Sequence, residues 1–166
     1  MRKLILLFIV VLLTGCNETA NNQSYEGVLL RNNNVKAVKL EGDNHLMVSI
    51  DLPQRDAVDV VNSGFLSMQQ ALTDLLKSGK EPNSKQIYFT FYAEIVDASN
   101  HQTREPIFDI YFDTPELKTL NLENNITFYD YLRLAKVSIR QPVGYKALSE
   151  WCKSDDNSKF GNICHT

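Results

Sequence analysis

Acidic side chains on two neighbouring segments with strand-like alternation are the residues of this sequence with the clearest capacity for catalysis. Asp109 and Asp113 lie four residues apart, so in a strand both side chains point to the same side. Glu94 lies in the preceding segment and would face them across a hairpin. Because glycosidases act through two carboxylates held roughly 5–10 Å apart, Asp109 paired with Glu94 or Asp113 predicts glycan hydrolysis as one alternative. The competing interpretation is that these acids occupy the solvent face of an antiparallel sheet.

Three tyrosines share that side of the same two segments. Tyr88 and Tyr92 alternate along the first segment, and Tyr111 lies on the second. Tyrosine combines a large contact area with a polar tip and is enriched at interfaces, so these side chains predict a binding face. The alternative is that aromatic residues simply favour strands, and that C-terminal helices cover this side as a second layer.

Other catalytic and metal-binding patterns are missing from the sequence. It contains no Gly-x-Ser-x-Gly motif, no Ser followed three residues later by Lys, no His-Glu-x-x-His pattern, no calcium loop and no glycine-rich phosphate loop. His45, His101 and His165 fall at a strand start, in a turn and at the penultimate position, where ordinary exposed side chains are expected. We therefore assign no catalytic residue, no metal ligand and no cofactor.

The hydrophobic periodicity predicts the elements that position these residues. Period-two alternation indicates strands at 35–40, 45–52, 86–96 and 107–112, and a further short strand at 28–30. Helical spacing indicates a long amphipathic helix over 56–78, and shorter helices over 114–120, 128–138 and about 145–151. This order predicts an α+β domain with an antiparallel sheet of about four strands, the long helix and C-terminal helices packed mainly on one face.

The apolar residues predict which faces meet in the core. One side of the two long strands carries large apolar side chains, namely Ile87, Phe89, Phe91, Ala93, Ile95, Phe108, Ile110 and Phe112. The long helix repeats apolar residues at spacings of three and four from Val58 to Leu75. Such spacings also suit a coiled-coil seam for a partner, but the broad stripe favours packing on the chain's own sheet.

The N-terminus has the features of an export signal. Arg2 and Lys3 precede the apolar run 4–13, which is shorter than the roughly 20 residues that span a bilayer. The sequence Leu13-Thr14-Gly15-Cys16 that ends this run resembles the lipobox of bacterial lipoproteins. The alternative is an ordinary secretory signal peptide with an incidental cysteine.

The lipoprotein resemblance implies a cellular address. It implies that 1–15 is a signal peptide, that Cys16 becomes the lipidated first residue, and that lipid chains anchor the protein to a membrane. By the sorting rule of such lipoproteins, Asn17 favours the outer membrane, with the protein facing the periplasm. The polar stretch 17–26 then continues from Cys16 as a tether, so 16–26 is the lipidated N-terminus and 27–166 forms a single α+β domain.

Charge and the remaining cysteines limit the function further. The 20 acidic and 17 basic residues give a formal net charge of −3, which offers no electrostatic footprint for nucleic acid. In an oxidising envelope, Cys152 and Cys164 are expected to form one disulfide. The alternative, a metal site with His165, lacks a fourth ligand with zinc-site spacing.

The C-terminal stretch 148–166, LSEWCKSDDNSKFGNICHT, is similar to the tail of conjugation entry-exclusion lipoproteins, although it lacks the proline that those loops usually carry. The sequence as a whole predicts a lipid-anchored envelope protein that acts as a binding or interaction module, with an envelope protein as its partner. Glycan hydrolysis, an entry-exclusion role and a purely structural link between membrane and wall are the alternatives.

Overall fold

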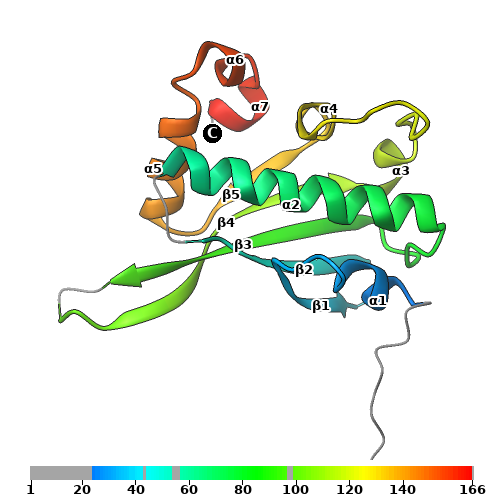
Figure 1. Cartoon of the computed structure of the whole chain (residues 1–166), viewed down its shortest axis with the longest axis horizontal. Coiled ribbons are helices and arrows are strands. Elements are labelled where there is room, and N and C mark those ends of the chain that lie inside the picture. The colour runs from blue at the N-terminus through cyan, green and yellow to red at the C-terminus, as the bar shows by residue number, and fades with distance from the viewer. Residues whose placement is uncertain (1–23, 43, 54–56, 97–98, 166) are drawn as a thin grey trace, which may run out of the picture.

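The computed structural model describes residues 24–42, 44–53, 57–96 and 99–165, which form a single mixed sheet with helices (Figure 1). The sheet has five strands in the order β1-β2-β3-β4-β5. Their bounds are β1 (Val35–Glu41), β2 (His45–Asp51), β3 (Gln86–Val96), β4 (Gln102–Asp113) and β5 (Lys136–Ile139). The predicted α+β class is confirmed, and the strand number and direction need correction.

The sheet is mixed because the long helix connects, along the chain, two strands that are direct neighbours in the sheet. Helix α2 (Ala57–Ser78) carries the chain from the end of β2 back to the beginning of β3, and these two strands pair in parallel. Parallel neighbours require such a crossover, whereas hairpins join antiparallel strands. The other three pairings, β1 with β2, β3 with β4 and β4 with β5, are antiparallel.

The fifth strand replaces the end of a predicted helix. Helix α4 (Phe128–Leu132) begins at the predicted capping box, in which the Thr127 backbone N–H donates to Asp130 at 2.9 Å. It ends far short of Ser138 because the chain turns at Arg133 and pairs as β5 with the edge of β4. The helix predicted over 128–138 is therefore wrong in its second half.

The short strand predicted at 28–30 is also wrong. Helix α1 (Tyr25–Leu29) occupies this region, and the Gly27 N–H donates to its N-cap, the Ser24 hydroxyl, at 3.1 Å. Val28 and Leu29 are buried where α1 meets α2. The helix includes residues 25 and 26, the last two of the predicted tether 16–26.

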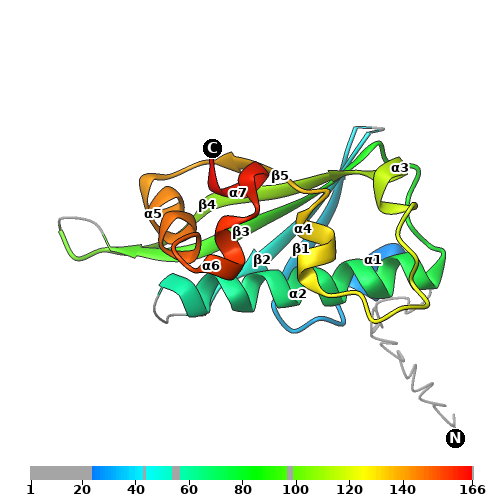
Figure 2. The ribbon, with the colours of Figure 1, turned by 90° about the horizontal axis from the view of Figure 1, so that it is seen from above.

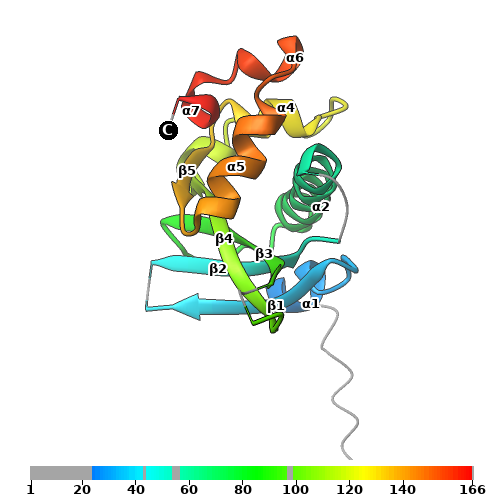
Figure 3. The same cartoon turned by 90° about the vertical axis from the view of Figure 1, so that its left-hand side faces the viewer.

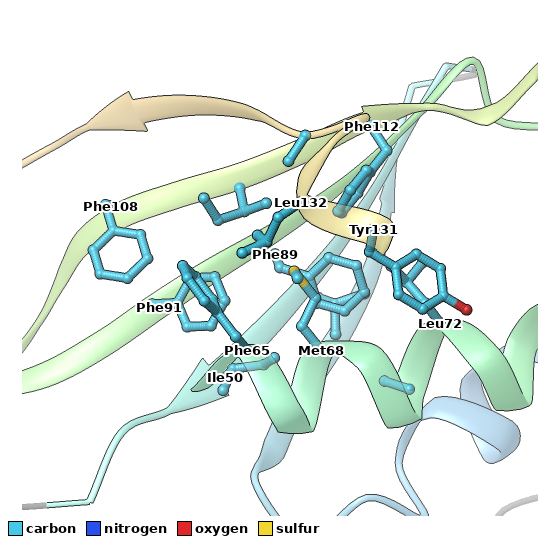
Figure 4. Close-up of a cluster of buried hydrophobic side chains, with 14 of the residues drawn as sticks. Ile50, Phe65, Met68, Leu72, Phe89, Phe91, Phe108, Phe112, Tyr131 and Leu132 are labelled. Atoms are coloured by element: carbon cyan, nitrogen blue, oxygen red, sulfur yellow. The ribbon is translucent and has the colours of Figure 1, made fainter. Parts of the chain in front are cut away.

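Helix α2 forms the centre of the core. Phe65, Met68 and Leu72 on its inner side are fully buried and point toward the phenylalanines of β3 (Figure 4). The predicted core face of β3 and β4 is confirmed, with Ala93 and Ile95 only half-buried. Both lie beyond the irregularity in strand register after Phe91, where β3 and β4 continue as an arm past the helical layer (Figure 1).

The remaining helices lie at the two ends of the sheet. Figure 2 shows α5 (Pro142–Trp151), α6 (Asp155–Ser158) and α7 (Gly161–Cys164) at one end, and α3 (Thr114–Leu117) at the other. Trp151 of α5 is fully buried and packs edge-on against Phe65, with 5.1 Å between ring centroids. The C-terminal helices therefore complete the same core that α2 begins.

The predicted cysteine pair joins the C-terminal helices. Cys152, which follows α5, is disulfide-bonded to Cys164 at the end of α7, with 5.7 Å between the two Cα atoms. The bond closes a loop that carries Phe160, a buried neighbour of Trp151. The paired thiols are not available as metal ligands beside His165.

We expect replacement of both Cys152 and Cys164 by Ser to lower the free energy of unfolding by about 3 kcal/mol, because the open loop gains conformational entropy in the unfolded chain. The measurement is equilibrium urea unfolding of the full chain. The oxidised parent treated with reductant is the matched control and should lose the same amount. An unchanged unfolding midpoint in the double variant would contradict a stabilising role of this bond.

Candidate binding face

One face of the sheet lies away from the helices. In Figure 3, α2 lies on one side of the strands, and no described helix lies over the opposite side. We call this opposite side the open face. The alternative in which C-terminal helices cover the tyrosines is therefore wrong within the described residues.

Strand register arranges the open face in rows that run across the strands. One row comprises Lys39, Met47, Tyr88, Tyr111 and Lys136. The next comprises Ala37, Ser49, Thr90, Asp109 and Ser138, which we call the central row. Asp51, Tyr92 and Pro106 form a third row on its other side.

The structure brings two of the three predicted tyrosines together. Tyr88 and Tyr111 are direct partners across β3 and β4, and their rings stack with centroids 4.8 Å apart. His45 packs edge-on against Tyr88 at 5.5 Å. Tyr92 is four residues from Tyr88 along β3, which at the rise of a strand is about 13 Å, so it stands apart on the far side of the central row.

Hydrogen bonds fix the stacked pair from one side. The Tyr88 hydroxyl donates to Gln86 Oε1 at 3.0 Å, and Gln86 Nε2 donates to Asp113 Oδ1 at 2.8 Å. Lys136 Nζ donates to the other oxygen of Asp113. Burial, followed by the neighbouring Tyr111, raises the pKa of Tyr88, so its hydroxyl keeps its proton and remains a donor at neutral pH.

Asp113 is held as an anion within this network. The hydrogen bonds from Lys136 and then Gln86 lower the pKa of its carboxyl group. A general acid needs the opposite, a raised pKa that keeps the proton near neutral pH. Asp113 is therefore suited to orient Gln86 and Lys136 and unsuited to donate a proton in glycoside hydrolysis.

Asp109 is the most deeply placed carboxylate on the open face. Its side chain is 3 % exposed, and its Oδ2 accepts from Arg140 Nε at 2.7 Å. Its Oδ1 is buried and has no hydrogen-bond partner among the described residues. Arg140 follows β5, and within the described residues its guanidinium makes no other hydrogen bond, so its remaining N–H donors have no partner there.

Strand geometry separates the carboxylates that were candidates for hydrolysis. Asp109 and Asp113 are four residues apart on β4, or about 13 Å, which exceeds the separation that glycosidases use. Glu94 is the register partner of Arg104 in the β3–β4 arm, whereas Asp109 is opposite Thr90. These positions argue against glycoside hydrolysis by Asp109 paired with either Glu94 or Asp113.

Two hollows adjoin the rows of the open face. A hollow of about 360 Å³ follows the central row between Met47 and Tyr92, with Arg140 at its margin. A larger one of about 850 Å³ lies at the end of the sheet where β3 begins and β4 ends. Ser84 and Thr114 line the larger hollow, and their buried hydroxyl oxygens form no hydrogen bond with any residue that the structure describes.

Sequence reasoning missed the residues that organise this face. The predicted helix over 128–138 includes Lys136 and ends before Arg140. The sequence therefore did not predict Lys136 as the partner of Asp113, or Arg140 as the partner of Asp109. The available signal was the alternation of Val137 and Ile139 with polar neighbours, which is typical of a half-buried strand. Because this alternation is short, the sequence of the segment is equally compatible with a helix.

Two further features are not found among the described residues. No group of three or more His, Cys, Asp or Glu side chains in that part of the chain is arranged to hold a metal ion. Among the same residues, no helix combines the length and apolar character needed to cross a membrane. Cys16, the predicted lipidation site, lies outside the described residues.

Comparisons with known proteins identify no relative. The chain matches no protein-family model, and no curated protein or solved structure is significantly similar to it. The lipoprotein signal and the entry-exclusion likeness of 148–166 therefore stay predictions from the sequence.

We expect Asp113→Asn to destabilise the protein at pH 7 and to lose this effect in acid. A lowered folded-state pKa contributes stability above the unfolded value near 4, and this contribution disappears as the pH falls through the folded-state pKa. The measurement is the unfolding midpoint of parent and variant between pH 7 and pH 2. Glu123→Gln, at an exposed carboxylate in a loop, is the control. A constant difference across this range would contradict the assignment.

Proposed function

We propose that this protein is a lipid-anchored component of a bacterial cell envelope that acts by binding through the open face of its sheet. Cys16 is the proposed anchor, and the outer membrane, facing the periplasm, is the proposed location. The partner is a component of the same envelope. No catalytic step is part of this proposal.

The observation that carries the proposal is the organisation of a sheet face that no described helix covers. Three tyrosines of that face, Tyr88, Tyr92 and Tyr111, are half-buried, so part of each side chain is accessible to a partner. The stacked pair is fixed by Gln86 and Asp113 before any partner arrives. A face whose side chains are already ordered loses little conformational entropy on binding, which favours affinity.

Replacement of Tyr88, Tyr92 and Tyr111 together by Ser is expected to abolish capture of the partner while the domain stays folded. The measurement is cross-linking in intact cells that express the full-length protein, followed by purification and quantification of both attached protein and attached wall glycan. Tyr145→Ser is the matched control, because Tyr145 is an exposed tyrosine of α5, a helix that packs against α2. Equal capture by the triple variant and the parent would exclude the open face as the binding surface.

Cys16→Ala tests the anchor separately. The variant is expected to lose incorporation of radiolabelled palmitate and to move from the membrane to the soluble envelope fraction, because two or more acyl chains are needed for stable anchoring. Cys152→Ser with Cys164→Ser is the control, since it removes thiols but leaves the lipobox. Palmitate incorporation into the Cys16→Ala form would contradict the proposed site.

A further inference from the structure

The central row is a line of small side chains between two rows of larger ones. Ala37, Ser49 and Thr90 lie in register across β1, β2 and β3. Met47 borders them on one side and Tyr92 on the other, and the hollow of about 360 Å³ follows this line. We call this hollow the trough. It runs across the strands rather than along them.

The direction of the trough excludes recognition by strand addition. Strands within a sheet already pair their backbone groups with both neighbours, so only an edge strand is free to add a strand. A chain lying across β1 to β4 meets side chains alone, over about 14 Å at the usual spacing between strands. Its affinity must therefore come from its own polar groups and from contact with the flanking side chains.

The trough presents hydrogen-bonding groups of fixed position. Ser49 and Thr90, which both carry hydroxyl groups, line it between β1 and β4, and Thr90 is only 6 % exposed. At one margin, Asp109 fixes Arg140 through Nε, which leaves the rest of the guanidinium to donate to a ligand. Such donors suit the oxygen atoms of hydroxyl and amide groups.

Charge on this face gives no advantage to an ionic ligand. Four ion pairs of the described residues lie on the open face, and each cation there has an acidic partner: Lys39 with Glu41, Arg104 with Asp51, Lys136 with Asp113, and Arg140 with Asp109. An incoming charge would meet both signs close together. A neutral ligand with many polar groups avoids this competition.

We infer that the trough binds a neutral carbohydrate chain that carries hydroxyl and N-acetyl groups. Sugar rings present apolar C–H surfaces to side chains such as Tyr92 and Met47, while their hydroxyl and acetamido oxygens reach Ser49, Thr90 and Arg140. This inference rests on the proposed function, because it names the ligand class of the same open face. The partner is then the N-acetylated sugar backbone of the wall, apart from its charged peptides, rather than a protein.

The test is titration of the full-length protein, in detergent, with the tetramer of β-1,4-linked N-acetylglucosamine, followed by NMR of labelled tyrosine rings. The resonance of Tyr92 is expected to shift with saturation, while that of Tyr145 stays constant. The deacetylated tetramer, which is cationic, is expected to bind more weakly. Purified wall sacculi, tested by co-sedimentation, extend the result from the probe to the natural polymer.

Two variants place the ligand in the trough. Ser49→Tyr fills the floor and is expected to raise Kd for the tetramer about tenfold or more, equivalent to ~1.4 kcal/mol. Arg140→Lys keeps a cation beside Asp109 but loses the planar set of donors, so we expect a several-fold rise. Ser158→Tyr makes the same substitution at an exposed position on α6 and should leave Kd unchanged.

The outcomes separate this inference from the proposed function. Saturable tetramer binding that Ser49→Tyr weakens and Ser158→Tyr does not would support the inference. Absence of binding to both tetramer and sacculi, or equal binding by Ser49→Tyr, would overturn it. If the triple tyrosine variant still loses a captured envelope protein in that case, the open face remains the binding surface and its partner is a protein. If capture is also unchanged, both proposals fail.

Discussion

The packing of α2 against one face of the sheet is the constraint on which the rest of the structure depends. Because side chains alternate between faces along a strand, burial of Phe89 and Phe91 under α2 commits Tyr88, Thr90 and Tyr92 to the other side. A register slip by one residue would move the phenylalanines into solvent. The packing of the hydrophobic core thus determines which side chains lie on the open face, although the core is on the other side of the sheet.

The C-terminal region extends this constraint to the charges of the open face. β5 joins the edge of β4 because Val137 and Ile139 pack on the core, and the same alternation turns Lys136 and Ser138 outward. Arg140 follows at the next outward position and meets Asp109. The ordered charges on the face are therefore a consequence of apolar packing behind it, supported by the helices that the disulfide joins.

The sequence predicts well those features that repeat over many residues. The apolar stripe of α2 and the alternation of β3 and β4 persist over several turns or residue pairs, and the structure confirms both. The parallel pairing of β2 with β3 depends on where the chain returns after α2, which no local pattern specifies. β5 has only four residues, which is too short for local propensity to decide between helix and strand. Its pairing with β4 decides its conformation. The partners of Asp109 and Asp113 were unpredictable for the same reason.

The Asp109–Arg140 pair is better explained by orientation than by stability. A buried carboxylate loses its hydration, and a single cation seldom compensates for the loss, so apolar residues of similar size are often as stable or more stable. Here one oxygen of Asp109 also lacks a hydrogen bond within the described part of the chain, which adds to the cost. What the pair does achieve is a guanidinium fixed at the edge of the trough, although its side chain is 43 % exposed. A long side chain at that exposure would otherwise sample many rotamers, and a fixed set of donors is what recognition of a polar ligand requires.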